Sequence, residues 1–265
     1  MKKLTFRLTV LVLLALYLPG LAPVLRAAPR VVHVFVALAD NEHQGIIPVP
    51  PALGNGHDPQ RNLYWGAAFG VKTFFRGSKE WRLIESRRPA KEAILERCIF
   101  KHREQDVFLV ADAYEGSQIR SAVSDFLSAA AGLDEEKLNV RDGSAETPIA
   151  LGGGADLTAY VGHDAFMDFQ IPLIVGTKGE KRRSAVILAC ASKQYFAPYL
   201  RETGAEPLLW TTGLMAPEAY TLKAALDGWM AGESGEEIRQ RTAEAYNRYQ
   251  KCGARAADRL FATGW

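Results

Sequence analysis

The chain has 265 residues, of which 48% are hydrophobic and 23% are charged, a composition typical of a globular protein. Its 32 Lys and Arg residues nearly balance its 30 Asp and Glu residues. Composition and charge therefore exclude collagen-like chains, disordered chains and basic nucleic-acid-binding tails. The length is sufficient for a substantial core without disulfide or metal support.

Residues 1–27 have the pattern of a secretory signal. Three basic residues open the segment, an apolar run spans residues 10–18, and small residues follow at Ala27 and Ala28. The apolar run is shorter than the roughly 18 to 20 residues that cross a bilayer. We expect a cleaved leader and export to the periplasm or the extracellular space, with an uncleaved leader as the alternative.

The remaining chain is close to neutral, because 28 basic residues face 30 acidic residues once the leader is removed. Nucleic acid is therefore not an expected partner. No later segment has the length of a membrane span, so we expect no stable membrane span after removal of the leader.

Strands and helices are predicted to alternate along the rest of the chain. In chain order, the first predicted elements are a buried strand at 31–38, a long loop at 41–61, a helix at 62–75, a strand at 81–84, a helix at 89–100, a strand at 107–111 and a helix at 117–131. The later ones are a polar stretch at 134–145, a flexible turn at 152–154, strands at 157–161 and 171–175, a basic turn at 178–181, strands at 185–189 and 208–211, a helix starting near Pro217 and a final amphipathic helix at 236–259.

This alternation favours an α/β fold, a three-layer helix-sheet-helix arrangement with a mostly parallel central sheet. Buried-type strands rich in Val, Ile and Leu are typical of parallel sheets covered on both faces. The sequence contains no low-complexity linker and no internal repeat. We therefore expect residues 28–265 to form one domain that ends in the amphipathic helix.

The chain has three cysteines, Cys98, Cys190 and Cys252, so at least one thiol stays unpaired in an oxidising compartment. Cys98 and Cys252 fall on the apolar faces of predicted helices. We expect both to be small buried residues, or to be bonded to each other. Cys190 differs because it lies at the end of a predicted strand.

Four residues that can carry chemistry follow predicted strands: Asp40, Asp112, His163 and Cys190. Ligands of open parallel sheets bind beyond the carboxyl ends of the strands, so we expect these side chains at one edge. An imidazole can take the proton of a thiol and later return a proton to a leaving amine. Backbone N–H groups of Cys190 and of the His163 turn could stabilise the oxyanion.

The pairs Gly162-His163 and Ala189-Cys190, each at the end of a strand, resemble the motifs of caspase-like cysteine peptidases, the group of caspases, metacaspases, legumains, clostripain and gingipains. The likeness covers roughly residues 31–231. It implies a caspase-like fold and an exported cysteine endopeptidase or related amide hydrolase that acts on a peptide or protein and needs no cofactor or metal. His163 would be the general base and Cys190 the nucleophile.

Three carboxylates are candidates for substrate binding: Asp40, Asp112 and Asp164. An acidic pocket wall built from Asp40 or Asp112 would favour Arg or Lys before the scissile bond. Asp164 stands where the family usually has Gly, and it either orients His163 or caps the turn.

Two other interpretations stay open. The departure at Asp164 favours a non-catalytic binding or scaffold protein of the periplasm that kept the sheet and lost the chemistry. The residues Asp40, His43 and His57 could instead serve a metal-dependent hydrolase, although their spacing matches no metal motif and local backbone hydrogen bonding is the simpler explanation.

Overall fold

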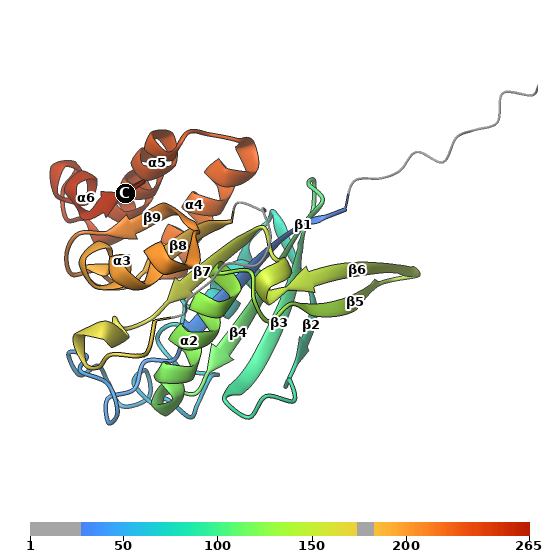
Figure 1. The fold of residues 1–265 in the computed structure, drawn as a ribbon, viewed down its shortest axis with the longest axis horizontal. Helices are drawn as coiled ribbons and strands as arrows, with labels where there is room; N and C mark the ends of the chain where they lie inside the picture. The colour runs from blue at the N-terminus through green and yellow to red at the C-terminus, as the bar shows by residue number, and fades with distance from the viewer. Residues whose placement is uncertain (1–27, 174–182) are drawn as a thin grey trace, which may run out of the picture.

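The computed structural model describes residues 28–173 and 183–265, which form an α/β structure around an eight-stranded sheet (Figure 1). The predicted leader and the predicted basic turn at 178–181 lie outside the described residues. Of the strand predicted at 171–175, residues 171–173 have no regular structure, and the other two residues also lie outside the described part.

The sheet is mostly parallel. Its order is β10 (Phe261–Ala262), β9 (Glu206–Thr211), β8 (Ser184–Leu188), β7 (Leu157–Val161), β1 (Arg30–Ala37), β4 (Val107–Tyr114), β3 (Ile94–His102) and β2 (Trp81–Arg87). The five strands from β9 to β4 are parallel, whereas β10, β3 and β2 run antiparallel to their neighbours. Strand β1 pairs with β4 on one side and with β7 on the other, so the order of the parallel strands reverses between β1 and β7.

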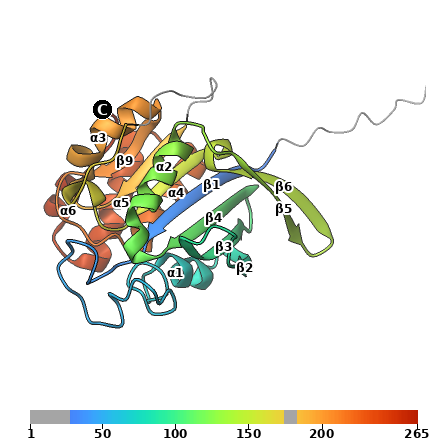
Figure 2. The same cartoon turned by 60° about the horizontal axis from the view of Figure 1, so that its bottom comes forward.

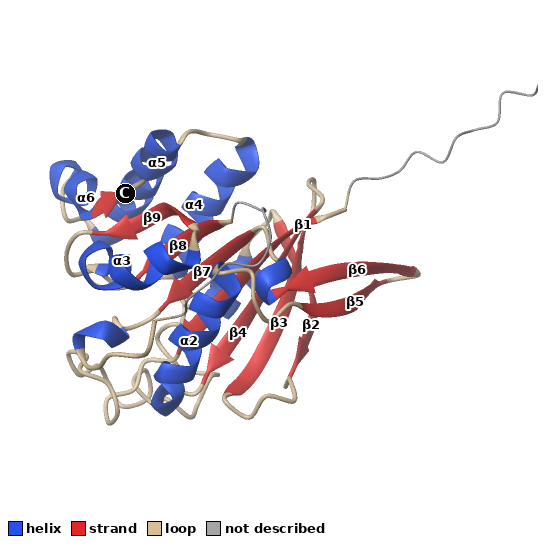
Figure 3. Cartoon of the chain, in the orientation of Figure 1, coloured by secondary structure: helices blue, strands red, loops and turns tan. Residues whose placement is uncertain are grey.

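Helices cover both faces of this sheet, as Figure 3 shows. One face carries α2 (Ile119–Ala130) and α3 (Ser192–Thr203), and the other carries α1 (Val71–Gly77), α4 (Ala219–Ala231) and α5 (Gly235–Gln250). Successive residues of β1 point to opposite faces of the sheet. Val34 packs in the core between the sheet and α4, and Phe35 packs in the core between the sheet and α2. Burial on both faces explains the continuous apolar sequence of the strand. The prediction of an α/β fold with a mostly parallel sheet between helices is thus confirmed.

The prediction of a helix at 89–100 is wrong, because residues 94–102 form β3 between β2 and β4. A short apolar run fits both a helical and an alternating pattern, and here pairing on both sides decides for the strand. Cys98 on β3 is fully buried, as expected, although on a strand.

The polar stretch at 134–145 contributes to a two-stranded hairpin, β5 (Glu136–Asp142) and β6 (Ala145–Leu151), that projects from the body of the molecule (Figure 2). Gly143 in its turn has a φ of +63°, which favours glycine. Val140 and Leu151 of this hairpin pack with Val31 and Val110 of the main sheet. The predicted turn at 152–154 is a single 3₁₀ turn.

The helices also depart from the predicted bounds. The helix expected at 62–75 is reduced to α1, and the loop after β1 extends to it. The long C-terminal helix expected at 236–259 is split into α5 and α6 (Ala254–Leu260), since Lys251 adopts a left-handed conformation with a φ of +52°. Cys252 lies in this break and is exposed, so its predicted inward position is wrong.

The edge beyond β9 is covered by residues 261–265. In β10, Phe261 pairs with Thr211, and Trp265 packs edge-on against Trp210 at 5.4 Å between ring centroids. Within the described ranges, no helix combines the length and the apolar character needed to cross a membrane.

Candidate active site

A cavity of about 340 Å³ lies at the carboxyl edge of the parallel strands. Its walls are segments that follow β1 (45–49 and 63–64), β7 (162–163 and 167), β8 (190) and β9 (214–218). This position matches the general rule that open α/β sheets bind ligands beyond their carboxyl ends, near the point where the strand order reverses. Both His163 and Cys190 line this one cavity.

His163 is held in place from several directions. Gly162, just before it, has a φ of +156°, and a Cβ there would lie 3.0 Å from the Ala37 carbonyl oxygen, so the turn into His163 requires glycine. The Tyr160 hydroxyl donates to the His163 carbonyl oxygen at 2.8 Å. The ring Nε2 lies 2.8 Å from Asp168 Oδ2, and the same carboxylate oxygen accepts the Gly45 N–H at 2.9 Å.

Asp168 therefore fixes the tautomer of the neutral imidazole. An ionised carboxylate only accepts hydrogen bonds, so Nε2 carries the proton and Nδ1 keeps its lone pair. A base oriented by a third group is the arrangement that nucleophilic catalysis uses. Asp168 is not among the site residues predicted from the sequence. The only signal was an acidic residue five positions after the histidine, and a turn of this kind has no pattern that predicts which way its side chains face.

Cys190 lies at a sharp junction between β8 and α3. The next residue, Ala191, is a non-glycine residue in the left-handed region with a φ of +48°, a strained conformation of the kind that clusters at functional sites. The Ala191 N–H donates to the Gly213 carbonyl at 2.8 Å, which ties this turn to the segment after β9. A nucleophile on a tight strand-to-helix turn is presented at the top of the sheet.

The Cys190 thiol contacts the backbone of Met215, whose N–H donates to Sγ at 3.4 Å. Burial raises the pKa of the Cys190 thiol, the Met215 N–H opposes this by favouring the thiolate, and the nearby Asp164 carboxylate adds to the rise. The resting thiol therefore holds its proton more tightly than an exposed cysteine, and a base is needed to remove it.

Asp164 caps a turn, and among the described residues no hydrogen bond or ion pair joins its side chain to His163. Its Oδ1 accepts the Phe166 N–H at 3.0 Å at the start of a 3₁₀ turn, Ala165–Met167. Its Oδ2 is buried and has no hydrogen-bond partner among the described residues. Burial raises the pKa of Asp164 to about 7 despite the Phe166 N–H, and the charge of Asp168 adds to this. Asp164 is not part of the cavity wall.

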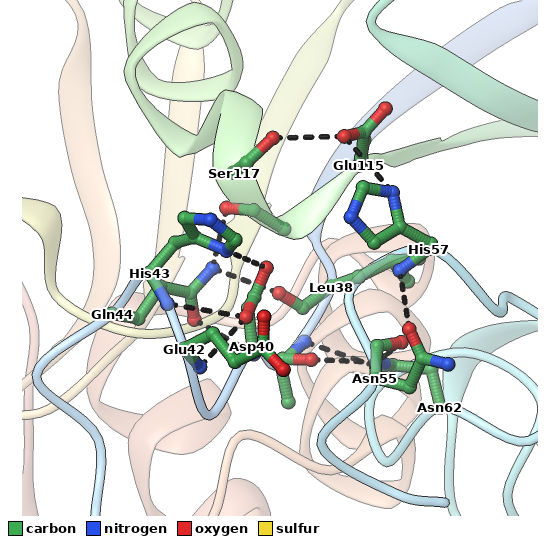
Figure 4. A network of polar contacts seen from close by, with 12 residues as sticks. Leu38, Asp40, Glu42, His43, Gln44, Asn55, His57, Asn62, Glu115 and Ser117 are labelled. Atoms are coloured by element: carbon green, nitrogen blue, oxygen red, sulfur yellow. Dashed lines mark hydrogen bonds and ion pairs between the residues drawn. The ribbon is translucent and has the colours of Figure 1, made fainter.

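Asp40 organises the loop after β1 (Figure 4). Its Oδ1 accepts the N–H groups of Glu42 and His43 at 2.9 and 3.2 Å, and its Oδ2 lies 3.0 Å from His43 Nδ1. A Cβ on Gly116 would lie 2.4 Å from the Asp40 Cβ, so the backbone packs closely against this side chain. The Asp40 carboxylate stabilises its own loop through these hydrogen bonds, and it is not part of the wall of the cavity that holds Cys190.

Asp112 is not at a strand end, because β4 continues to Tyr114 and Asp112 pairs with Phe35 in the register of β1. It is fully buried, accepts two hydrogen bonds from Arg97 at 2.6 and 2.8 Å, and lies 3.0 Å from His33 Nε2. These three residues line a different cavity, of about 330 Å³, on the face of the sheet that α2 covers. The structure therefore does not bring Asp112 to the cavity of Cys190.

The two histidines of the metal hypothesis use different carboxylates (Figure 4). His43 pairs with Asp40, whereas His57 Nδ1 lies 3.1 Å from Glu115 Oε1. In residues 28–173 and 183–265, no three His, Cys, Asp or Glu side chains are grouped so that they could hold a metal ion.

All three thiols are free. Cys98 is buried and Cys252 is exposed, so the predicted alternative of a bond between them is not present. Burial, with a contribution from the charge of Glu96, raises the pKa of Cys98 to about 12.

Comparison of the chain with family models, with curated proteins and with solved structures gave no match.

Proposed function

We propose that this protein is an exported cysteine endopeptidase or related amide hydrolase of the caspase-like type, with Cys190 as nucleophile and His163 as general base. The observation that carries the proposal is that these two residues follow the adjacent parallel strands β7 and β8 and line one cavity. The strained turn at Ala191 and the orientation of His163 by Asp168 give further support.

In the proposed reaction, His163 Nδ1 takes the Cys190 proton as the sulfur attacks the carbonyl carbon of the scissile bond. The imidazolium then gives this proton to the leaving amine, and water releases the acyl group from sulfur in a second step. Because burial raises the pKa of Cys190, little thiolate is present at rest, and attack needs His163 to remove the proton. Asp168 stabilises the imidazolium through Nε2.

The developing oxyanion requires N–H donors that are not already in use. Within the described residues, the backbone N–H groups of His163 and Cys190 make no hydrogen bond, whereas that of Ala191 is bonded to Gly213. The first two are therefore the candidate donors.

The test is covalent labelling with a thiol-reactive peptide electrophile, read by mass spectrometry. We expect modification of Cys190 in the native protein, none at this position in Cys190→Ala, and a large loss of rate in His163→Ala. Cys252→Ala is the matched control, because it removes an exposed thiol outside the cavity and should leave the labelling of Cys190 unchanged. If the reagent still labels the peptide-binding site of Cys190→Ala, Cys190 is not the nucleophile.

A non-catalytic binding or scaffold role is the second candidate. It is favoured by the buried Asp164 carboxyl, whose charge opposes formation of the thiolate. A native protein that binds peptides reversibly at the cavity, with no modification of Cys190 over hours, would select this function.

A further inference from the structure

The cavity that holds His163 and Cys190 is apolar over most of its remaining wall. The apolar side chains on this wall include Ile46, Ile47, Val49, Leu63, Met167 and Leu214. They come from the loop after β1, the turn after β7 and the segment after β9. Three separate parts of the chain thus supply the same kind of surface.

Two of these side chains are far more exposed than large apolar residues normally are: Ile47 is 82% exposed and Leu214 is 72% exposed. They lie on the wall of the same cavity although they come from distant parts of the chain. Exposed apolar groups gathered around a hollow mark a surface that binds another apolar group.

The described part of the wall offers few charged partners for a ligand side chain. It contains no Lys or Arg, and its one carboxylate, Glu218, accepts at Oε2 from two neutral donors, the Tyr220 hydroxyl at 2.7 Å and Gln250 Nε2 at 2.9 Å. Asp40 and Asp112, which would have favoured a basic residue, are hydrogen-bonded elsewhere. In the described part of the wall an acidic side chain would have no Lys or Arg as counter-ion and a basic one would have Glu218 alone, so the apolar wall favours an uncharged side chain over either.

Within the proposed peptidase function, on which this step rests, we infer that the cavity binds the substrate residue that precedes the scissile bond and selects an uncharged apolar side chain such as Leu, Met or Phe. Cys190 attacks the carbonyl carbon of that residue, so its side chain is the one that enters the adjacent hollow. At about 340 Å³ the cavity is at the small end of ligand sites and suits one side chain.

The experiment uses acetyl-tripeptide chloromethyl ketones that differ only in the last residue, which is Leu, Phe, Ala, Arg or Asp. The rate constant for modification of Cys190 is measured for each by mass spectrometry. We expect the Leu and Phe reagents to react at least about 100-fold faster than the Asp reagent, and about 10-fold faster than the Arg and Ala reagents, because an apolar wall without Lys or Arg disfavours an acidic side chain most.

A charge placed at the cavity should change this order. Leu214→Asp alters an exposed side chain of the wall, so the fold should tolerate it, and we expect the preference for Leu over Arg to fall by about 10-fold or more. Leu173→Asp is the matched control, because Leu173 is 48% exposed and is not on the wall. It should leave the order unchanged.

The outcomes separate the two proposals. Modification of Cys190 that is as fast with the Arg or Asp reagent as with the Leu reagent would overturn the apolar selectivity and leave Cys190 as the nucleophile. Absence of Cys190 modification by every reagent would overturn the proposed function, and the selectivity with it.

Discussion

Asp112, Arg97 and His33 form a buried charged cluster whose disruption should destabilise the protein strongly. Asp112 is fully buried, and the side chains of Arg97 and His33 are almost so. Gly152 donates its N–H to His33 Nδ1 at 3.1 Å, so Nε2 carries the ring proton and donates to Asp112. Asp112→Asn keeps the shape of the side chain and removes the negative charge.

The expected cost is about 3 to 5 kcal/mol in the free energy of unfolding, the range for a buried ion pair that loses one partner. Among the described residues, the variant leaves the buried Arg97 guanidinium with Glu136, whose side chain is 47% exposed, as its one charged partner. Two hydrogen bonds to a charged donor are weakened at the same time.

The assay is urea unfolding of the native protein and of the variant, followed by circular dichroism. The matched control is Asp142→Asn, which breaks another two-bond Arg–Asp pair, with Arg82, on the surface. That pair is exposed to solvent, so its loss should cost no more than about 1 kcal/mol. If Asp112→Asn lowers the free energy of unfolding no more than Asp142→Asn does, burial does not make this ion pair more important for stability than a surface pair.

The pH dependence gives an independent check. Hydrogen bonds from Arg97 and His33 outweigh burial and hold the pKa of Asp112 below its ordinary value of 3.8. Its stabilising contribution is therefore present above about pH 4 and is lost as the pH falls through the lower folded-state pKa. The difference in stability between the native protein and Asp112→Asn should shrink between about pH 5 and pH 2.

Three further predictions concern separate parts of the molecule. Burial raises the pKa of Asp164 from 3.8 to about 7, so ionisation of this carboxyl should destabilise the native protein as the pH rises between these values. Asp164→Asn should lack this loss and should be the more stable protein by a few kcal/mol at pH 8. Urea unfolding of both proteins at pH 5 and pH 8 measures the difference. An Ellman's assay should titrate Cys252 rapidly in the native protein and Cys98 only after unfolding; fast reaction of Cys98 would contradict its burial. Ser234→Ala removes the capping box with Glu237 at the start of α5 and should cost about 1 kcal/mol in thermal or urea unfolding, while an unchanged midpoint would mean that this cap contributes nothing.

The parallel strands could be predicted from the sequence because their signal is local. Runs such as 31–38 and 185–189 are continuous and rich in β-branched residues, and burial on both faces of a sheet requires that pattern. Strand β5 carries mostly polar residues and its partner β6 contains Pro148, so neither strand has a strong local signal and their pairing is visible only once the chain is folded. The assignment of β3 failed since its spacing of apolar residues fits two periods.

Only part of the candidate site could be predicted from the sequence. Strand ends fix where Cys190 and His163 fall, and the structure places both on one cavity, while their catalytic roles stay predictions. Asp112 was misplaced because the predicted end of β4 was three residues too early. Asp168 and the apolar walls depend on how loops distant in sequence come together, and no local pattern encodes that.

The short antiparallel strand β10 has a practical consequence for anyone who handles this protein. It occupies the outer hydrogen-bonding side of β9, and Trp265 shields Trp210 beside it. Deleting residues 261–265 would expose the edge of β9 to pairing with strands of other chains. Such a truncated protein should show concentration-dependent aggregation in light scattering, whereas the intact chain should not.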